Sequence, residues 1–580
     1  MKARFGQVNG AAALSDIART RMTRRGFLGG SLALGGAGAL WPTPAGAKTP
    51  GFNFEALGHG VDGHHHVAPG YDARVLMRWG DSVTATAPPF DPQRQNATAQ
   101  AAQLGYNSDF IGYLPLPLAS GNSRHGLLCV NHEYCIEKLM FPGLGRYDEN
   151  FSQATRELAN IEMAAIGGAI VEVARGPDGL WQIVPASRFA RRITAGGTAM
   201  RLSGPAAGHA RLKTTADPSG TSVIGTVANC SGGMTPWGTW LTAEESFLYC
   251  FGSAIADDPE AEIDPALVDH PESRNFRRLG LPGRGYAWSR FDQRWNIDQE
   301  PNEANRFGWI VEIDPLDPES TPVKRTALGR FSHEGAAPIV NGDGRAVVYS
   351  ADDHYFEYFY RFVSERAFDP ARGVANGDLL DHGILSVARF DADGGVAWVP
   401  LVFGQGPLTP ENGFHSQADI AIETRRAADL LGATPLDRPE GVAIDPRAAP
   451  HGGKIYLSLT KNQRRSAEGL DAVNSRAANL WGQIIELTAP GGDHAAERFS
   501  WDILVACGNP AEQQVAARWH RDISPGGWFA CPDNLALDSA GRLWVATDQD
   551  AATHWPDFDP TMPPRPSILA ITRQGGGRIG

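Results

Sequence analysis

The sequence of 580 residues has little cysteine and no strongly basic stretch after its N-terminal segment. Six cysteines are too few for a dense disulfide framework in a chain of this length. They are Cys129, Cys135, Cys230, Cys250, Cys507 and Cys531. The 52 Lys and Arg residues face 65 Asp and Glu residues, which gives a formal net charge of −13. Because nucleic acids are bound by concentrated positive charge, this excess of acid argues against nucleic acid as a partner.

A long hydrophobic run is also missing. Residues 28–40 are apolar, but they are too few and too rich in glycine to span a bilayer core of about 30 Å. They follow the pair Arg24 and Arg25 and precede a small-residue cleavage site that ends at Ala47. This pattern predicts a twin-arginine export signal over residues 1–47. The protein is then periplasmic or secreted, meets the twin-arginine translocase during export and has no stable membrane insertion.

Long amphipathic helical patterns are scarce. Only residues 152–170 and 416–431 have the helical period over more than a few positions. Short β-type runs beside Gly, Asp or Pro turns recur instead, at residues 309–315, 344–349, 453–459 and 541–547. The sequence therefore predicts an all-β fold with a few short helices.

Two stretches of the chain look like copies of one unit. Residues 438–445 and 531–538 each place an acid, Glu440 or Asp533, before a strand, and a Gly-containing turn and a second strand follow. Such repeats are typical of a β-propeller, whose blades present ligands toward a central channel. A β-sandwich also contains many hairpins, but its ligands would not recur at one place in each repeat.

No linker divides the chain after the export signal. We therefore predict a single β-propeller domain, with six blades, over residues 48–580. Residues 254–305 and 367–383 have little periodicity, and we expect them to form long inserted loops on the faces of the propeller.

Acidic residues at the ends of strand-like runs are accompanied by one thiol. Cys230 begins a Gly-rich, aromatic segment, and Glu244 and Glu245 end it. Further acids in similar surroundings are Glu334, Glu440, Asp533 and Asp548. Carboxylates gathered without positive partners repel one another, and bound cations would neutralise them. The pattern therefore indicates a metal site.

Several short motifs follow one another along nearly the whole chain. They include Arg78-Trp79-Gly80-Asp81, Tyr106-Asn107-Ser108-Asp109, Asn131-His132-Glu133-Tyr134, Gly204-Pro205-Ala206-Ala207-Gly208-His209, residues 229–245, His333-Glu334-Gly335-Ala336, Arg438-Pro439-Glu440-Gly441 and Pro532-Asp533-Asn534. In these motifs the sequence resembles the PhoX-type alkaline phosphatase family. The resemblance implies an exported propeller enzyme that hydrolyses phosphate monoesters at a centre of iron and calcium ions joined by an oxo bridge.

The resemblance also implies a set of site residues. The implied metal ligands are Cys230, Glu244, Glu245, Glu334, Glu440, Asp533, Asp548 and Glu133. A thiolate suits iron, while carboxylates suit both Fe(III) and Ca²⁺. To this set we add Arg438 as the expected catalytic cation, because it lies two residues from Glu440 and a guanidinium can engage two phosphoryl oxygens. His209, with His132 and His333, is a candidate for orientation or proton transfer. One departure is Ala243, where the family pattern has Cys.

Each assignment has an alternative. Cys230 is otherwise a buried, inert cysteine, the acids are salt-bridged, and Arg438 pairs with Glu440 to close a turn. For the whole protein, the alternatives are a calcium-dependent propeller hydrolase of lactones or other non-phosphate esters, and a non-catalytic, calcium-stabilised binding propeller. Nothing in the sequence demands a second subunit, so a monomer is the default expectation.

Overall fold

The computed structural model describes residues 54–58, 64–144, 151–253, 270–447, 453–524, 526–548, 568–572 and 575–578. The export signal expected over residues 1–47 lies outside these ranges and stays a prediction. Among the described residues, no helix has the length and apolar character needed to cross a membrane.

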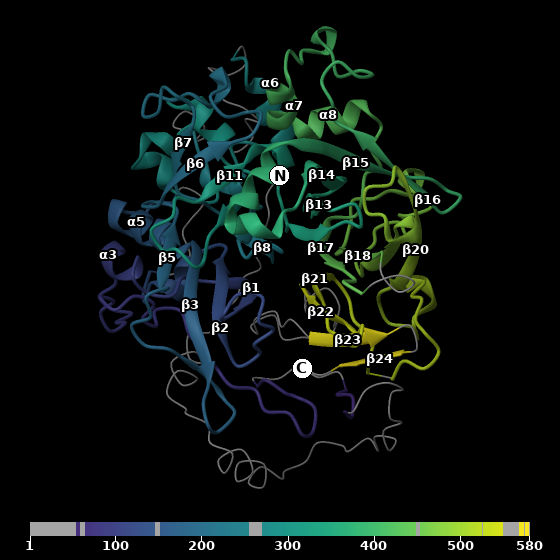
Figure 1. Cartoon of the computed structure of the whole chain (residues 1–580), viewed down its shortest axis with the longest axis horizontal. Coiled ribbons are helices and arrows are strands. Elements are labelled where there is room, and N and C mark those ends of the chain that lie inside the picture. Colours follow the sequence, from purple (N-terminus) through teal and green to yellow (C-terminus); the bar gives the residue numbers. More distant parts are fainter. Residues whose placement is uncertain are drawn as a thin grey trace.

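The described chain is mostly β-structure and forms four hydrogen-bonded sheets (Figure 1). The first sheet contains β1 (Ser108–Pro115), β2 (His125–His132), β3 (Gly167–Arg175), β4 (Trp181–Ile183) and β5 (Arg191–Thr194). The second contains β6 (Ala199–Ser203), β7 (Ser222–Ile224), β8 (Asn229–Met234), β9 (Trp240–Glu244), β10 (Ile310–Ile313) and β11 (Val323–Arg325). Strands β6 and β11 pair in parallel, and the other pairs of this sheet are antiparallel.

The third sheet is the largest and consists of two antiparallel units. One unit contains β12 (Ala337–Val340), β13 (Arg345–Ala351), β14 (Phe359–Ala367), β15 (Gly383–Phe390) and β16 (Gly395–Pro400). The other contains β17 (Pro439–Ile444), β18 (Lys454–Leu459), β19 (Gln483–Thr488) and β20 (Arg498–Ala506), and the two units join where β16 pairs with β20. The fourth sheet contains β21 (Pro532–Leu537), β22 (Leu543–Thr547), β23 (Ile568–Thr572) and β24 (Gly575–Arg578). The two hairpin units expected from the sequence are thus confirmed as β17–β18 and β21–β22.

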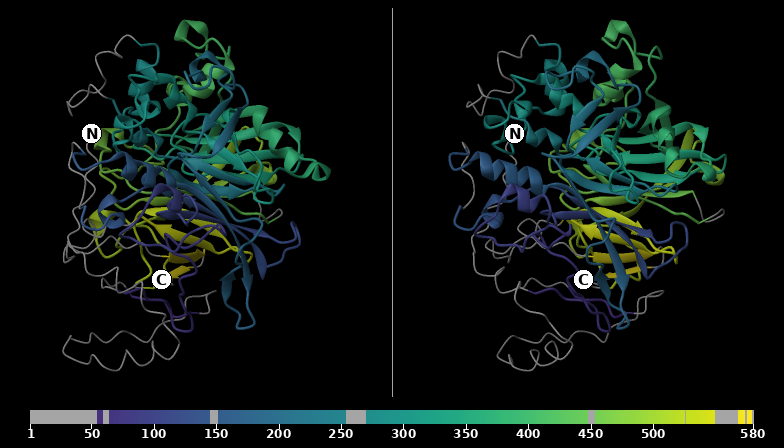
Figure 2. Two further views of the ribbon diagram at one scale, coloured as in Figure 1. Left: turned by 90° about the vertical axis from the view of Figure 1, so that its left-hand side faces the viewer. Right: turned by 60° about the vertical axis from the view of Figure 1, so that its left-hand side comes forward.

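The helices are short. They are α3 (Ala97–Gln100), α4 (Glu137–Met140), α5 (Arg156–Ala165), α6 (Ser273–Leu279), α7 (Gln417–Ile422) and α8 (Thr424–Leu430), with 3₁₀ turns between strands. The two expected helical stretches are confirmed as α5 and as the pair α7 and α8. The side chains of Thr155 and Ser416 accept hydrogen bonds from the backbone N–H groups of Leu158 and Asp419, which caps α5 and α7 at their N-termini. In both views of Figure 2, the green α7 and α8 lie at the upper end, away from the yellow fourth sheet.

Strands at the edges of the four sheets lie beside one another. Strand β8 contacts β1 and β12, and β17 contacts β12 and β21. The series closes where the Asn534 amide on β21 donates to Asp109 Oδ1 on β1 over 3.1 Å. In Figure 1 these strands gather near the middle of the molecule. The mainly β architecture is confirmed, whereas the six-bladed propeller stays a prediction.

Tryptophan side chains fill much of the core. Trp237, Trp240 and Trp309 are buried, while Trp544 is partly buried and packs against Phe54. The region expected to be an inserted loop differs from the expectation. In its described part, 270–305, Trp288 and Trp295 are fully buried and belong to the largest hydrophobic cluster. This part of the insertion therefore belongs to the core. Burial of its large aromatic side chains removes much apolar surface from water, which a loop on the protein surface would leave exposed.

Candidate metal centre

Four potential ligands share one unusual local geometry. Each lies two residues after a non-glycine residue with positive φ, and each lies at a register shift of its strand. The pairs are Asn107 (φ 54°) with Asp109, Ala228 (φ 51°) with Cys230, Arg438 (φ 54°) with Glu440, and Cys531 (φ 49°) with Asp533. A left-handed residue followed by a bulge re-aims the next side chains, at a cost of about 1–2 kcal/mol. Strands β1, β8, β17 and β21 therefore all begin with a side chain turned out of the regular pleat.

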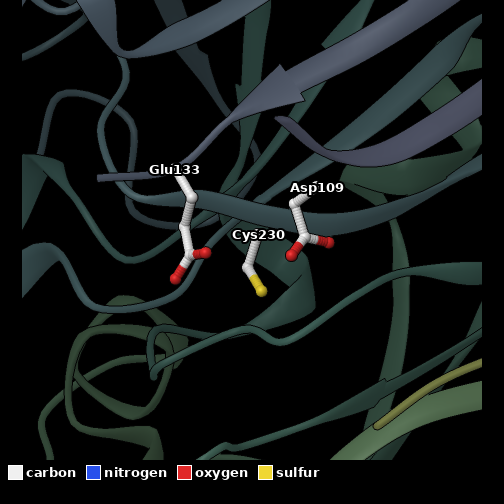
Figure 3. Close-up of side chains that lie close together, drawn as sticks. All are labelled: Asp109, Glu133 and Cys230. Carbon is white, nitrogen blue, oxygen red and sulfur yellow. The ribbon is translucent and has the colours of Figure 1, made fainter. Parts of the chain in front are cut away.

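Asp109, Glu133 and Cys230 form the first cluster. Each offers one ligand atom, and these atoms all lie within 4.8 Å of one another. Figure 3 shows the two carboxylates on either side of the thiol. Glu133 follows β2, and its backbone N–H donates to the carbonyl of Asn107 over 3.1 Å. This bond fixes the end of β2 against the start of β1.

Glu334, Glu440 and Asp533 form the second cluster, whose ligand atoms also lie within 4.8 Å of one another. The two clusters touch, because Cys230 Sγ donates to Glu334 Oε1 over 3.2 Å. Asp533 Oδ1 is buried and accepts no hydrogen bond from the part of the chain that the structure describes. A buried carboxylate oxygen without a donor is costly unless another group satisfies it.

The pKa values of these groups reflect burial first and mutual repulsion second. Both causes raise the pKa values of Glu133, Glu334, Glu440 and Asp533 well above the ordinary carboxyl range. The pKa of Asp109 rises to about 6, and that of the Cys230 thiol rises well above 9.0. Burial and mutual repulsion therefore disfavour the charged forms of these groups. Bound cations would favour those charged forms, since metal ligands must be deprotonated.

Arg438 is the positive side chain in contact with this acidic region. Its Nε and Nη2 donate to the two carboxylate oxygens of Asp353 over 2.9 and 2.6 Å. Nη2 also lies 3.0 Å from Glu440 Oε1, an ion pair that is not aligned as a hydrogen bond. The nearby Glu245 has a pKa raised to about 8 by burial and by the charge of Asp353, against the opposing charge of Arg438.

The donor set fits a mixed metal centre. It offers one thiol for a soft or borderline ion and several carboxylates for hard ions, in two clusters that touch. The orphaned Asp533 Oδ1 is the atom that such an ion would satisfy.

Comparison with known proteins agrees with this chemistry. A model of the alkaline phosphatase PhoX family matches residues 52–576. The chain belongs to this family. Among solved structures, Pseudomonas fluorescens PhoX in complex with vanadate, a transition state analogue, is similar with a TM-score of 0.80 and 38% sequence identity, over 91% of this chain and 88% of that chain.

A glucose dehydrogenase structure has a TM-score of only 0.27 and 10% identity, over 77% of this chain and 82% of that chain. No curated protein sequence matched the chain. The predicted activity is confirmed by the family: this PhoX protein is a phosphatase that hydrolyses phosphate monoesters. The lactonase and the non-catalytic alternatives are set aside.

Glu244 does not join the acids of the PhoX centre. Its Oε1 accepts from Lys324 Nζ over 2.7 Å, and its Oε2 accepts from the backbone N–H groups of Gly308 and Trp309 over 3.0 and 3.1 Å. Glu244 is the last residue of β9, and adjacent side chains of a strand point to opposite sides. The structure therefore separates the expected ligand pair, and only Glu245 faces Asp353 and Arg438.

The three histidines have other partners. His209 Nε2 lies 3.8 Å from Asp419 Oδ1, and its Nδ1 accepts from the Arg211 backbone, so its recorded contacts are with α7 and its own turn. His132 is buried and accepts from the Gly105 N–H. His333 Nε2 donates to the Gly329 carbonyl, and burial lowers its pKa to about 3. None of these contacts reaches the two clusters, and the proton-transfer role expected for His209 stays a prediction.

Asp548 lies at the rim. It is exposed, its backbone N–H donates to the Cys531 carbonyl, and its charge raises the pKa values of Asp109, Glu133 and Asp533. Its position therefore agrees with a place at the edge of the centre.

Two acids of the site were missed by sequence reasoning. Asp109 lies inside one of the family motifs and is the second residue of β1, the same place that Glu440 and Asp533 have in β17 and β21. Asp353 offers no such signal, because its role depends on contact with Arg438, 85 residues away.

Proposed function

We propose that this PhoX-family phosphatase holds Fe(III) and Ca²⁺ in one multinuclear centre at the middle of a β-propeller. The proposed ligands are Asp109, Glu133, Cys230, Glu245, Glu334, Glu440 and Asp533, with Asp548 at the rim. The observation that carries the proposal is the direct contact between the two partly buried clusters through Cys230 and Glu334. When bound, the ions would polarise the phosphoryl oxygens and activate a water-derived nucleophile.

The protein's own part in the reaction is to position the ligands and to supply one positive charge. The positive-φ residues at the starts of β1, β8, β17 and β21 fix the direction of the ligand side chains that follow them. These side chains should therefore keep their orientation when the substrate binds. The positive charge of Arg438 lies beside Glu440, so a phosphate dianion meets a cation from the protein as well as from the metals. Phosphoryl transfer needs little more than this positioning and charge stabilisation.

The Nη1 group of Arg438 is available to donate a hydrogen bond to the substrate. The recorded hydrogen bonds to Asp353 use Nε and Nη2, and Nη1 has no hydrogen bond to any described residue. The bidentate bond to Asp353 holds the guanidinium plane in place at no cost to Nη1. We assign Nη1 to a phosphoryl oxygen whose charge grows in the transition state.

The decisive experiment combines metal analysis with turnover on protein purified with its metals intact. We expect iron and calcium together with hydrolysis of phenyl phosphate. Cys230→Ser should lose iron, whereas the control Cys507→Ser, at a buried cysteine outside the clusters, should keep it. Calcium without iron in the wild-type protein would refute the mixed centre.

A second pair of variants tests the cation. Arg438→Ala should lower kcat/KM by about 10²–10³-fold while metal content stays unchanged. Arg447→Ala is the matched control, because Arg447 pairs with Asp445 at the other end of β17 and should leave activity unchanged. Equal activity of both variants would remove Arg438 from the catalytic machinery.

We further propose that the phosphatase is exported as a folded monomer through the twin-arginine pathway. The support is the Arg24 and Arg25 pair with its short apolar stretch. Replacing both arginines with lysine should retain the protein in the cytoplasm with its leader uncleaved. Normal export of that variant would contradict the assignment.

A further inference from the structure

A second arginine lies near the metal centre and has no carboxylate partner. Arg464 is exposed, and no ion pair joins it to an acid among the described residues. Arg438, by contrast, contacts both Asp353 and Glu440. In a region this rich in acid, an arginine left without a carboxylate remains available to an anion from solution.

Arg464 is held in place by an aromatic ring. Its Cζ lies 3.8 Å from the centroid of the Tyr355 ring, well within the range of a cation–π contact. Tyr355 is fixed in turn, because Gln463 Nε2 donates to its hydroxyl over 2.8 Å and its backbone bridges to Asp437. An exposed arginine seated this way loses less freedom on binding a ligand than a mobile one does.

The same ring ties Arg464 to the catalytic cation. Arg438 Cζ lies 6.0 Å from the Tyr355 centroid, so two guanidinium groups approach one ring. Their charges also act together on the Tyr249 hydroxyl, where both oppose the rise of its pKa that burial and nearby acids cause. One small molecule with two anionic groups can therefore reach both arginines.

We propose that Arg464, seated on Tyr355, is a specificity residue that binds a second anionic group of the substrate. The preferred substrates are phosphate monoesters whose leaving group itself carries a carboxylate or a further phosphate. Arg438 engages the phosphoryl group that is cleaved, and Arg464 engages the anion on the leaving side. This inference rests on the proposed role of Arg438 and on the proposed metal centre.

The test uses two esters that differ in one charge, phenyl phosphate and 4-carboxyphenyl phosphate. For Arg464→Gln we expect kcat/KM on the carboxylated ester to fall at least tenfold, mainly through KM, and to change less than twofold on phenyl phosphate. Tyr355→Leu should reduce the same discrimination by removing the ring beneath Arg464. Arg188→Gln is the matched control, since Arg188 is also exposed and lies 4.5 Å over a ring, that of Phe189, in the loop between β4 and β5.

The outcomes are distinct. An equal fall on both esters would mean general attraction of phosphate and would overturn the proposal, as would no fall on either ester. Calorimetric binding of pyrophosphate and of orthophosphate gives a readout without turnover. Arg464→Gln should weaken pyrophosphate at least fivefold and leave orthophosphate unchanged, and equal effects on the two anions would overturn the proposal. Failure of the proposed function is separate, because it would appear as absent metals or absent turnover of phenyl phosphate by the wild-type protein.

Discussion

Glu244 and Glu245 are neighbours in the chain and both are buried, but their carboxylates have different surroundings. Glu244 lies against Lys324 and two backbone N–H groups, which satisfy its charge within the protein. Glu245 faces Asp353 and the acid clusters, and its pKa is raised to about 8. Burial is common to both, so burial does not identify a metal ligand. What distinguishes them is ion pairing: Lys324 pairs with Glu244, whereas Arg438 pairs with Asp353 and Glu440 rather than with Glu245.

Asp352 and Asp353 repeat the contrast one segment away. The carboxylate of Asp352 accepts two hydrogen bonds from the buried Arg425, over 2.8 and 2.6 Å. Asp353 instead positions Arg438 at the edge of the centre. Alternation along an extended chain thus places one acid of each pair in a structural ion pair and the other at the site.

Removal of the cations from the proposed centre should have the largest effect. Chelation of the metals should reduce phosphatase activity by about a thousandfold or more, since metal ions supply several kcal/mol of transition-state stabilisation. Activity should return when iron and calcium are added together. Phosphate release by metal-free protein, checked by elemental analysis, would contradict the proposed centre.

The next test replaces each of the two neighbouring glutamates in turn. Glu244→Gln leaves Lys324 buried without its carboxylate, so we expect the free energy of unfolding to fall by about 3–5 kcal/mol while metal content per folded molecule stays unchanged. Glu245→Gln should do the reverse, with reduced metal content and activity but little loss of stability. Denaturant unfolding and elemental analysis of both variants measure the two effects.

A double variant serves as the control for Glu244→Gln. Replacing Lys324 with Met together with Glu244→Gln removes both charges and should restore most of the lost stability. If Glu244→Gln alone lost metal and remained stable, the assignment of the two glutamates would have to be reversed.

His494 is a buried basic group outside the proposed centre, and its protonation should affect stability. His494 is buried beside Tyr349, Arg361 and Asp493, and its pKa is lowered to about 4, first by burial and then by Arg361. The folded protein therefore keeps it neutral, while the unfolded chain takes up a proton near pH 6.5. Stability is full above pH 6.5 and is lost as the pH falls toward 4, by at most about 3 kcal/mol.

His494→Gln should flatten this part of the pH profile of unfolding free energy. Titrations elsewhere in the chain are common to both proteins, so the difference between the two profiles isolates this residue. Parallel profiles from pH 6.5 to 4 would show that His494 is already charged in the folded state.

The smallest effect concerns the backbone that aims the ligands. Ala228 has a φ of 51°, which glycine adopts without strain. Ala228→Gly should therefore raise the free energy of unfolding by about 0.5–1 kcal/mol, the strain relieved less the entropy that glycine adds to the unfolded chain. The control Ala346→Gly, at a buried position in β13 outside the positive-φ set, should lower stability by about 1 kcal/mol. Destabilisation of both variants by equal amounts would mean that position 228 stores no strain.

The amino-acid sequence was enough to predict the family, the mainly β architecture, the short helices near residues 152–170 and 416–431, and most of the acids in the two clusters. These follow from local patterns: period, turn residues, and acids placed before strands. It could not separate Glu244 from Glu245, because Lys324 lies 80 residues further along the chain. Nor could it place Asp353 beside Arg438 or His209 beside Asp419. Such pairings depend on strand register and on how sheets pack, and only the tertiary structure decides which buried charge meets a cation of the protein and which is left for a metal.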